Sequence, residues 1–450
     1  MPVLPGTPLL GSLFELRSDY LQTILRASSE LGDVVRLDAG PPGWRASFYN
    51  VSAPELVLEV LSHPDQLTKD TQSYREIRQA FGNGMLTSQG ETWLRQRRFL
   101  APMFTPRRIA TTYASIMVEE TRELTRRWSA AAETGAALDA HAEMTRLTSR
   151  IIGRILFGSD VSSAMTQIMK FRFINDALLR RGISPRVAPL WVPTPANRRL
   201  SAALAQLRLA VDDIIAERRT RPTSGPETDM LGLLLSARDD SADDDRLTDA
   251  EVADQTLIFL LAGHDTTAST LACLLVELAR APQWQQTVRD ELVSVLGERL
   301  PTAADLPSLT WTGRVMREGM RLYPAAHSIG RTSMSDLVLG GYALPAGSTV
   351  VVSPWTVHRN PRVWTDPDAF DPRRFALAPG EYPGGHRYAW FPFGAGPHAC
   401  VGMQLALTEV PLVLAVLLQQ FRVTTELEKI PLQAAISLHP SAPLPIRVQR

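Results

Sequence analysis

Hydrophobic residues follow a helical period along most of the chain up to about Pro324. The clearest helix begins at Thr248, because Thr248 and Glu251 have the spacing of a capping box. The pattern continues to Arg280, and Pro282 marks its end. The stretch LIFLLAG at 257–263 is apolar on every side. We therefore predict that this long helix crosses the protein interior rather than lying on its surface.

Beyond Pro324 the pattern changes from helical to short and alternating. The sequence LVLGGYALPAGSTVVV predicts short strands joined by Gly-Gly and Pro-Ala-Gly turns. A Pro-, Asp- and Arg-rich meander, NPRVWTDPDAFDPRRF, follows, and a last helical pattern covers roughly 403–421. The whole chain is thus predicted to be mainly α with a small β part.

Composition narrows the class of protein. The chain is 44% hydrophobic and 21% charged, with a formal net charge of zero. These values are typical of a soluble globular protein and give no reason to expect a nucleic-acid partner. The N-terminus lacks the basic and apolar regions of a signal peptide, and no apolar run reaches the roughly 18 residues of a membrane span. With only two cysteines, Cys273 and Cys400, we expect no disulfide framework and a reducing cytoplasmic location without a membrane anchor.

One of these cysteines, Cys400, lies in the glycine-rich stretch FPFGAGPHACVG at 391–402. A lone cysteine is often a small buried hydrophobe, and a catalytic nucleophile would need a base closer than His398. Zinc would need more Cys or His ligands nearby. The segment also matches G-x-G-x-x-A, but no acidic residue follows about 20 positions later for a dinucleotide ribose. A fifth interpretation is an axial haem ligand, since glycines permit close approach and a helix begins just after the thiol.

Phe393, Gly396, Cys400 and Gly402 form a fairly specific pattern, and the choice among these interpretations rests on whether further motifs accompany it in order. This F-x-x-G-x-x-x-C-x-G pattern resembles the haem-binding signature of the cytochrome P450 family. The resemblance implies that Cys400, as a thiolate, is the axial ligand of haem iron. Two residues before the cysteine this family usually has arginine, where this chain has His398; we expect His398 to contact a haem propionate in its place.

A second motif, E-x-x-R, is formed by Glu318 and Arg321. Residues at i and i+3 share a helix face and can pair, although this pattern also occurs in many solvated helices. Downstream, Arg374 lies in the family-like segment P-x-R-F. The resemblance implies that the three side chains form a buried, structural ion-paired triad.

The segment AGHDTT, 262–267, lies midway along the long predicted helix. Glycine, aspartate and threonine are poor residues for a helix interior, so the plain interpretation is a tolerated weak point. The segment also resembles the family's oxygen-binding groove. That resemblance implies that Ala262 lies beside the haem, and that Asp265 and Thr266 form the acid–alcohol pair that supplies protons during oxygen activation.

The resemblance implies further contacts. Trp93 and Arg97, in W-x-x-x-R, and Arg331 correspond to family residues that contact a haem propionate. By position alone, we expect a mostly apolar substrate pocket lined by seven residues: Met85, Leu86, Ile258, Ala262, Ser328, Ile329 and Leu438.

Because the motifs occur in family order over nearly the whole chain, we expect residues 1–450 to form a single cytochrome P450 haem domain: a triangular helical body, a long central helix over the haem and small β-sheets. The implied activity is insertion of one atom of O₂ into a lipophilic terpenoid, polyketide, fatty acid or steroid of secondary metabolism, by hydroxylation or epoxidation. Electrons from NAD(P)H would arrive through a separate ferredoxin or flavodoxin-type partner and its reductase.

Two alternative functions stay open, a peroxygenase and a non-oxidative isomerase or dehydratase. Such enzymes commonly lack the acid–alcohol pair. A haem sensor would need neither that pair nor an apolar pocket.

Overall fold

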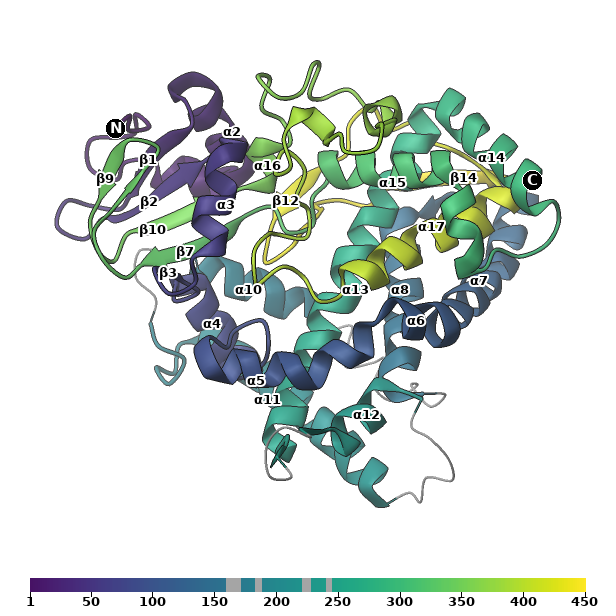
Figure 1. The fold of residues 1–450 in the computed structure, drawn as a ribbon, viewed down its shortest axis with the longest axis horizontal. Coiled ribbons are helices and arrows are strands. Elements are labelled where there is room, and N and C mark those ends of the chain that lie inside the picture. Colours follow the sequence, from purple (N-terminus) through teal and green to yellow (C-terminus); the bar gives the residue numbers. More distant parts are fainter. Residues whose placement is uncertain (159–170, 183–187, 221–227, 240–244) are drawn as a thin grey trace.

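The computed structural model describes residues 1–158, 171–182, 188–220, 228–239 and 245–450. Helices make up most of this part of the chain (Figure 1). They are α1 (Leu13–Ser18), α2 (Tyr20–Leu31), α3 (Pro54–Ser62), α4 (Gln72–Phe81), α5 (Gly90–Leu100), α6 (Pro106–Arg108), α7 (Ala114–Thr134), α8 (Ala140–Phe157), α10 (Phe171–Gly182), α11 (Pro195–Thr220), α12 (Met230–Ser236), α13 (Asp249–Arg280), α14 (Pro282–Leu296), α15 (Thr310–Leu322), α16 (Pro354–Val357) and α17 (Met403–Gln420).

The strands gather mainly at the end of the molecule that holds the N-terminus (Figure 1). A five-stranded sheet has the order β1 (Val34–Ala39), β2 (Ala46–Val51), β10 (Thr349–Val352), β7 (Ile329–Ser333) and β3 (Leu67–Thr68). In it β10 runs parallel to β2, and the other pairs are antiparallel. Smaller sheets contain β4 (Leu138–Asp139), β5 (Arg238–Asp239), β6 (Asp245–Arg246), β8 (Leu337–Leu339), β9 (Tyr342–Leu344), β11 (Arg422–Thr424), β12 (Leu432–Ala434), β13 (Leu438–Pro440) and β14 (Pro445–Gln449). The prediction of a mainly helical protein with a small β part is confirmed.

The long helix α13 runs through the middle of the molecule (Figure 1). It begins as predicted, with the Thr248 hydroxyl accepting from the Glu251 N–H and the Glu251 carboxylate accepting from the Thr248 N–H. Most of its residues are buried, as its uniformly apolar centre requires. Its neighbour α8 comes so close that a side chain at Gly263 would meet Ile152 Cδ1 at 2.8 Å. Gly263 is therefore needed for the packing of α13 against α8.

The N-terminal segment packs against a turn near the C-terminus. Leu16, Leu21 and Ile24 of the first two helices belong to the same buried cluster as Leu37, Trp355 and Leu438. This packing places α2 beside the segment that links α15 to β7, 308 residues further along the chain, as measured by the bond between Tyr20 and Ser328. One wall of the central cavity is formed where these distant segments meet.

Candidate active site

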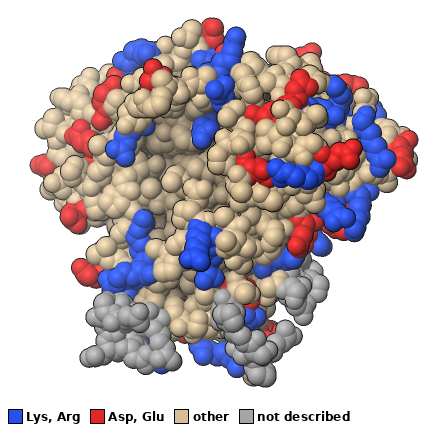
Figure 2. Space-filling model, turned by 45° about the vertical axis from the view of Figure 1, so that its right-hand side comes forward, with Lys and Arg blue, Asp and Glu red and all other residues tan. Residues whose placement is uncertain are grey.

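A cavity of about 570 Å³ lies among α13, the segment before β7 and the loop before α17. Its lining is mostly apolar, with side chains such as Leu86, Ile258, Phe259 and Ile329. Figure 2 shows one face of the molecule hollowed near its centre, with uncharged walls and charges of both signs around it. Cavities of this size and character bind small lipophilic molecules.

The loop that carries Cys400 is held by its own backbone. The Cys400 N–H donates to the Phe393 carbonyl at 2.9 Å, which closes the turn. Gly394 and Gly396 both have positive φ, +72° and +70°, which disfavours any side chain. A Cβ at Gly396 would lie 2.2 Å from the Leu61 carbonyl oxygen. The close approach that requires Gly396 is thus to the backbone of α3.

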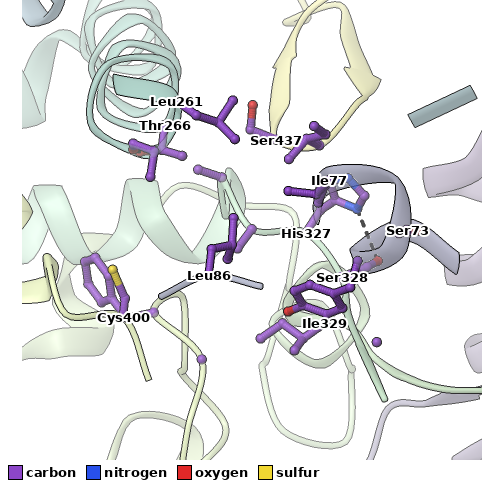
Figure 3. Close-up of a pocket in the computed structure, with 18 of the residues that line it drawn as sticks. Ser73, Ile77, Leu86, Leu261, Thr266, His327, Ser328, Ile329, Cys400 and Ser437 are labelled. Carbon is purple, nitrogen blue, oxygen red and sulfur yellow. Dashed lines mark hydrogen bonds between the residues drawn. The ribbon is translucent and has the colours of Figure 1, made fainter. Parts of the chain in front are cut away.

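The side chain of Cys400 faces the cavity from just before the N-terminus of α17 (Figure 3). Burial raises the pKa of its thiol, whereas hydrogen bonds from the backbone N–H groups of Gly402 and Met403 lower it. The positive end of the helix dipole favours the thiolate in the same way. The surroundings of Cys400 are therefore suited to a sulfur that becomes fully ionised when it coordinates a metal cation.

A cationic cluster, consisting of Lys69, Arg97, Arg331 and His398, lies near the Cys400 end of the cavity. Burial, followed by the charges of the other three members, lowers the pKa of His398 to about 3. Within the described residues, no carboxylate forms an ion pair with any of the four. The His398 Nδ1 atom is buried without a hydrogen-bond partner. Such a cluster is suited to an anionic ligand that would neutralise it.

Lys69 is the member of this cluster that no sequence motif indicated. Its ammonium donates to the carbonyls of Met85 and Leu86 at 3.4 and 3.0 Å. Burial and the charge of Arg331 lower the pKa of this amine to about 7. Only the composition could have drawn attention to Lys69, because it is one of three lysines in a chain whose other basic residues of this kind are arginines.

The remaining predicted contacts lie around the same loop. The Trp93 ring packs edge-on against the His398 ring, with centroids 4.2 Å apart. The Arg97 guanidinium lies over Trp93 and donates to the Pro397 carbonyl at 3.1 Å. Trp93, Arg331, Phe393 and His398 line the cavity, whereas Arg97 and Gly396 lie behind its wall.

The three residues of the predicted triad lie together. Arg321 Nε and Nη2 donate to the two carboxylate oxygens of Glu318 at 2.7 and 2.8 Å, and both side chains are fully buried. Arg374 Nε lies 3.3 Å from Glu318 Oε1. Arg321 also donates to the His358 carbonyl at the end of α16 and to the Pro367 and Ala369 carbonyls of the meander. The triad therefore fixes the meander to α15.

Asp265 and Thr266 both line the cavity from α13 (Figure 3 labels Thr266). The Thr266 hydroxyl donates to the Ala262 carbonyl at 2.7 Å, so its lone pairs stay available to a ligand. The Asp265 carboxylate accepts a hydrogen bond from the Ser437 hydroxyl, which comes from the turn between β12 and β13. Ser437 is a second residue that the sequence motifs did not indicate.

Six of the seven residues expected to line the pocket do line the cavity: Met85, Leu86, Ile258, Ala262, Ser328 and Ile329. Leu438 does not. It packs instead into the buried cluster formed with the N-terminal segment, and its neighbours Ala435, Ile436 and Ser437 face the cavity. Leu438 is the first residue of β13, and its side chain points away from that of its neighbour Ser437, as successive side chains of a strand do.

Glu409 on α17 also lines the cavity, and it carries a buried carboxyl oxygen without a hydrogen-bond partner. Burial raises the pKa of this carboxyl from 4.5 to about 8. The folded state thus retains a proton that the unfolded chain releases above pH 4.5, so the stability falls as pH rises toward 8, by up to about 1.4 kcal/mol per pH unit.

We expect Glu409→Gln, which is neutral at every pH, to be stabilised relative to the wild type by an amount that grows between pH 5.5 and 7.5. Urea unfolding midpoints at the two pH values measure this difference. Glu428→Gln, at an exposed position, is the control and should show no such growth. An equal difference at both pH values would show that Glu409 is ionised in the fold.

The geometry thus defines a class of protein: a mainly helical enzyme with a cysteine thiol, an acid–alcohol pair and an apolar cavity in one space. Comparison with known proteins gives the family. The cytochrome P450 family pattern matches residues 1–445. The chain belongs to the cytochrome P450 family, and it is a monooxygenase that acts on lipophilic small molecules.

Several curated proteins are similar over almost their full length. Cyclooctat-9-en-7-ol 5-monooxygenase of Streptomyces melanosporofaciens is 35% identical, over 93% of this chain and 88% of its own. Pentalenene oxygenase of Streptomyces avermitilis is 33% identical, over 94% and 91%. Putative cytochrome P450 132 of Mycobacterium tuberculosis is 32% identical, over 87% and 86%.

The haem that this family carries fits the site. Cys400 offers a sulfur toward which two backbone donors are directed, and the cationic cluster offers charges without ion-pair partners for two propionates. The orphaned Nδ1 of His398 provides an additional hydrogen-bonding atom. When bound, haem supplies the activation of O₂ with electrons that a reductase system provides.

Two helices, Asp249–Arg280 and Met403–Gln420, are long and apolar enough to cross a membrane by length and composition alone. In both, most of the apolar window is buried inside the protein. Among the described residues, these segments are therefore explained as core helices.

Proposed function

We propose that this chain, as a single haem domain over residues 1–450, oxidises a terpenoid of secondary metabolism by adding one oxygen atom from O₂. The observation that carries the proposal is that Cys400, Thr266 and a mostly apolar cavity of about 570 Å³ share one space. The relatives add to it, since their names include an alcohol and a hydrocarbon of terpenoid type. One name describes an alcohol and the other a hydrocarbon, so the two names do not indicate whether the substrate of this chain carries a hydroxyl group.

The residues of the site have distinct proposed roles. Cys400 would bind the haem iron, and its propionates would be held by Trp93, Arg97, Arg331, Lys69 and His398. The Thr266 hydroxyl donates to the Ala262 carbonyl. The lone pairs of Thr266 Oγ1 can therefore accept a hydrogen bond from a donor in the cavity and orient that donor. Asp265 relays protons from solvent toward the cavity, and Ser437 holds the Asp265 carboxylate in place.

The proton path distinguishes the monooxygenase from the peroxygenase alternative. With a ferredoxin or flavodoxin-type partner, its reductase, NAD(P)H and ¹⁸O₂, we expect the product to contain one labelled oxygen atom. Thr266→Ala should continue to consume NAD(P)H but give at least about tenfold less product per electron pair, because it lacks the hydroxyl that orients proton transfer. The remaining electrons should appear in released hydrogen peroxide.

Thr256→Ala is the matched control, because Thr256 makes the same bond to the residue four positions earlier, at 2.8 Å, but does not line the cavity. It should keep the product yield of the wild type. Full activity with added hydrogen peroxide and no NAD(P)H would instead establish a peroxygenase. Turnover of a substrate without any incorporated oxygen would establish the isomerase or dehydratase.

We also propose that the enzyme works in the cytoplasm and receives its electrons from a separate protein. Both cysteines are unpaired, as expected in a reducing compartment. The family pattern covers residues 1–445, and these residues form the haem domain that such a partner would reduce.

A further inference from the structure

The end of the cavity opposite Cys400 contains a small polar network that the oxidation chemistry does not use. It consists of Tyr20 of α2 and of His327 and Ser328, which precede β7. The Tyr20 hydroxyl lies 3.1 Å from Ser328 Oγ, and Ser328 Oγ lies 3.1 Å from His327 Nδ1. Figure 3 shows His327 and Ser328 on one side of the pocket and Cys400 and Thr266 on the other.

The direction of each hydrogen bond in this network follows from one fixed acceptor. His327 Nε2 lies 2.9 Å from the Ala435 carbonyl, which can only accept, so Nε2 carries the ring proton. Burial lowers the pKa of His327 to about 4, so the ring is neutral near pH 7 and Nδ1 is an acceptor. The Ser328 hydroxyl must therefore donate to Nδ1.

The same reasoning extends to Tyr20. Since the only hydroxyl hydrogen of Ser328 is directed to His327, the Tyr20 hydroxyl must donate to Ser328 Oγ. The polar hydrogens of Tyr20, Ser328 and His327 are then all used, by Ser328 Oγ, His327 Nδ1 and the Ala435 carbonyl in that order. What remains available to the cavity is lone pairs, on the Tyr20 oxygen and on Ser328 Oγ. The network accepts hydrogen bonds and does not donate them.

An acceptor in an otherwise apolar wall discriminates among ligands. A hydroxyl group can donate to it. A carbonyl or ether oxygen would face lone pairs, and would gain a hydrogen bond only if Tyr20 gave up its bond to Ser328. A hydrocarbon would leave the lone pairs of the Tyr20 oxygen without a donor, which is unfavourable.

We propose that Tyr20, Ser328 and His327 form a hydroxyl-recognition site, and that the substrate is a lipophilic alcohol whose hydroxyl binds there while a distant carbon is oxidised near Thr266. This rests on the proposed function and specifies its substrate class. The enzyme then acts after a reaction that introduces a hydroxyl group into the hydrocarbon, such as water capture during cyclisation or an earlier hydroxylation. Its product is a diol or an epoxy alcohol.

The test is the spin-state shift of the purified holoenzyme during titration, which measures binding rather than turnover. Three terpene skeletons, cedrane, patchoulane and labdane, are each supplied as hydrocarbon, alcohol and methyl ether. We expect an alcohol to bind about tenfold more tightly than its methyl ether. Decan-1-ol, its methyl ether and undecane form a series outside the terpenoids.

Three variants locate the effect. Tyr20→Phe removes one of the two acceptors and should reduce the preference for alcohol over ether. Ser328→Ala should also reduce it, but by strengthening ether binding, because the released Tyr20 hydroxyl can then donate. Tyr74→Phe is the control: Tyr74 lines the same cavity, its phenol makes no hydrogen bond with the described residues, and its loss should leave the preference unchanged.

The outcomes separate the two proposals. An unchanged preference in Tyr20→Phe, or a wild type that binds hydrocarbon or ether as well as alcohol, overturns the hydroxyl site and leaves the terpenoid function intact. An alcohol preference in the decanol series alone overturns the terpenoid class and supports the hydroxyl site. Absence of any shift in both series overturns both.

Discussion

Serine in place of Cys400 is expected to remove the monooxygenase activity while leaving the fold intact. Serine is close to cysteine in size, and the backbone bond from residue 400 to the Phe393 carbonyl does not depend on the side chain. Its hydroxyl is not ionised near neutral pH, so it cannot supply the electron density that a thiolate gives to haem iron. The loss should exceed the roughly 100-fold cost of removing an outer partner of a metal ligand.

The carbon monoxide difference spectrum of the reduced holoenzyme measures this ligand directly. The wild type should show the strongly red-shifted Soret band of thiolate ligation, and Cys400→Ser should lack it. Cys273→Ala is the matched control, because Cys273 is buried on α13 and burial raises the pKa of its thiol. It should keep the red-shifted band. A red-shifted band in Cys400→Ser would rule out Cys400 as the axial ligand.

Features that depend on neighbouring residues could be predicted from the sequence. The start of α13 was predicted from Thr248 and Glu251, because both halves of a capping box lie within one turn. Its end before Pro282 and the position of α17 follow from the same local rules. Motif order then indicated which segments meet, and Glu318, Arg321 and Arg374 do lie together.

Features that depend on distant contacts could not be predicted. Tyr20 and Ser328 are 308 positions apart, and Ser437 and Asp265 are 172 apart. No local pattern marks such pairs, because an isolated tyrosine or serine has the same signature on a surface as in a network. The proposed hydroxyl site and the partner of Asp265 therefore became visible only when α2 and the β12–β13 turn were placed against the cavity.

The reason why a glycine is required at a given position could not be predicted from the sequence. A glycine-rich loop beside a cysteine suggested close approach to a porphyrin, which is a sound expectation for the loop as a whole. For Gly396, however, the nearest obstacle is the Leu61 carbonyl, and for Gly263 it is the side chain of Ile152. A glycine in a functional motif can thus be required by packing between protein segments, and sequence alone does not distinguish the two causes.

Removing the charge of Glu318 is expected to cost about 3–5 kcal/mol of stability. In Glu318→Gln, Arg321 stays fully buried and keeps its bonds to the carbonyls of His358, Pro367 and Ala369. Carbonyl dipoles do not neutralise a full positive charge, and Arg374 adds a second cation 3.3 Å from the lost carboxylate oxygen. The two guanidinium groups would then lack the carboxylate that they share, which is the costly outcome for a buried pair.

The control for Glu318→Gln has the same spacing on a different surface. Glu123 and Arg126 also pair at i and i+3, but both side chains are more than half exposed, at 52% and 67%. Glu123→Gln should change the stability by less than about 1 kcal/mol, because water screens an exposed pair. Urea unfolding midpoints, together with haem retention after gel filtration, measure both variants.

Equal and small changes in the two variants would show that the triad does not hold the meander to α15. Full haem retention in Glu318→Gln would lead to the same conclusion. A large loss of stability and haem in Glu318→Gln alone would instead show that the buried triad on α15 also positions the Cys400 loop. The meander lies between α15 and that loop along the chain.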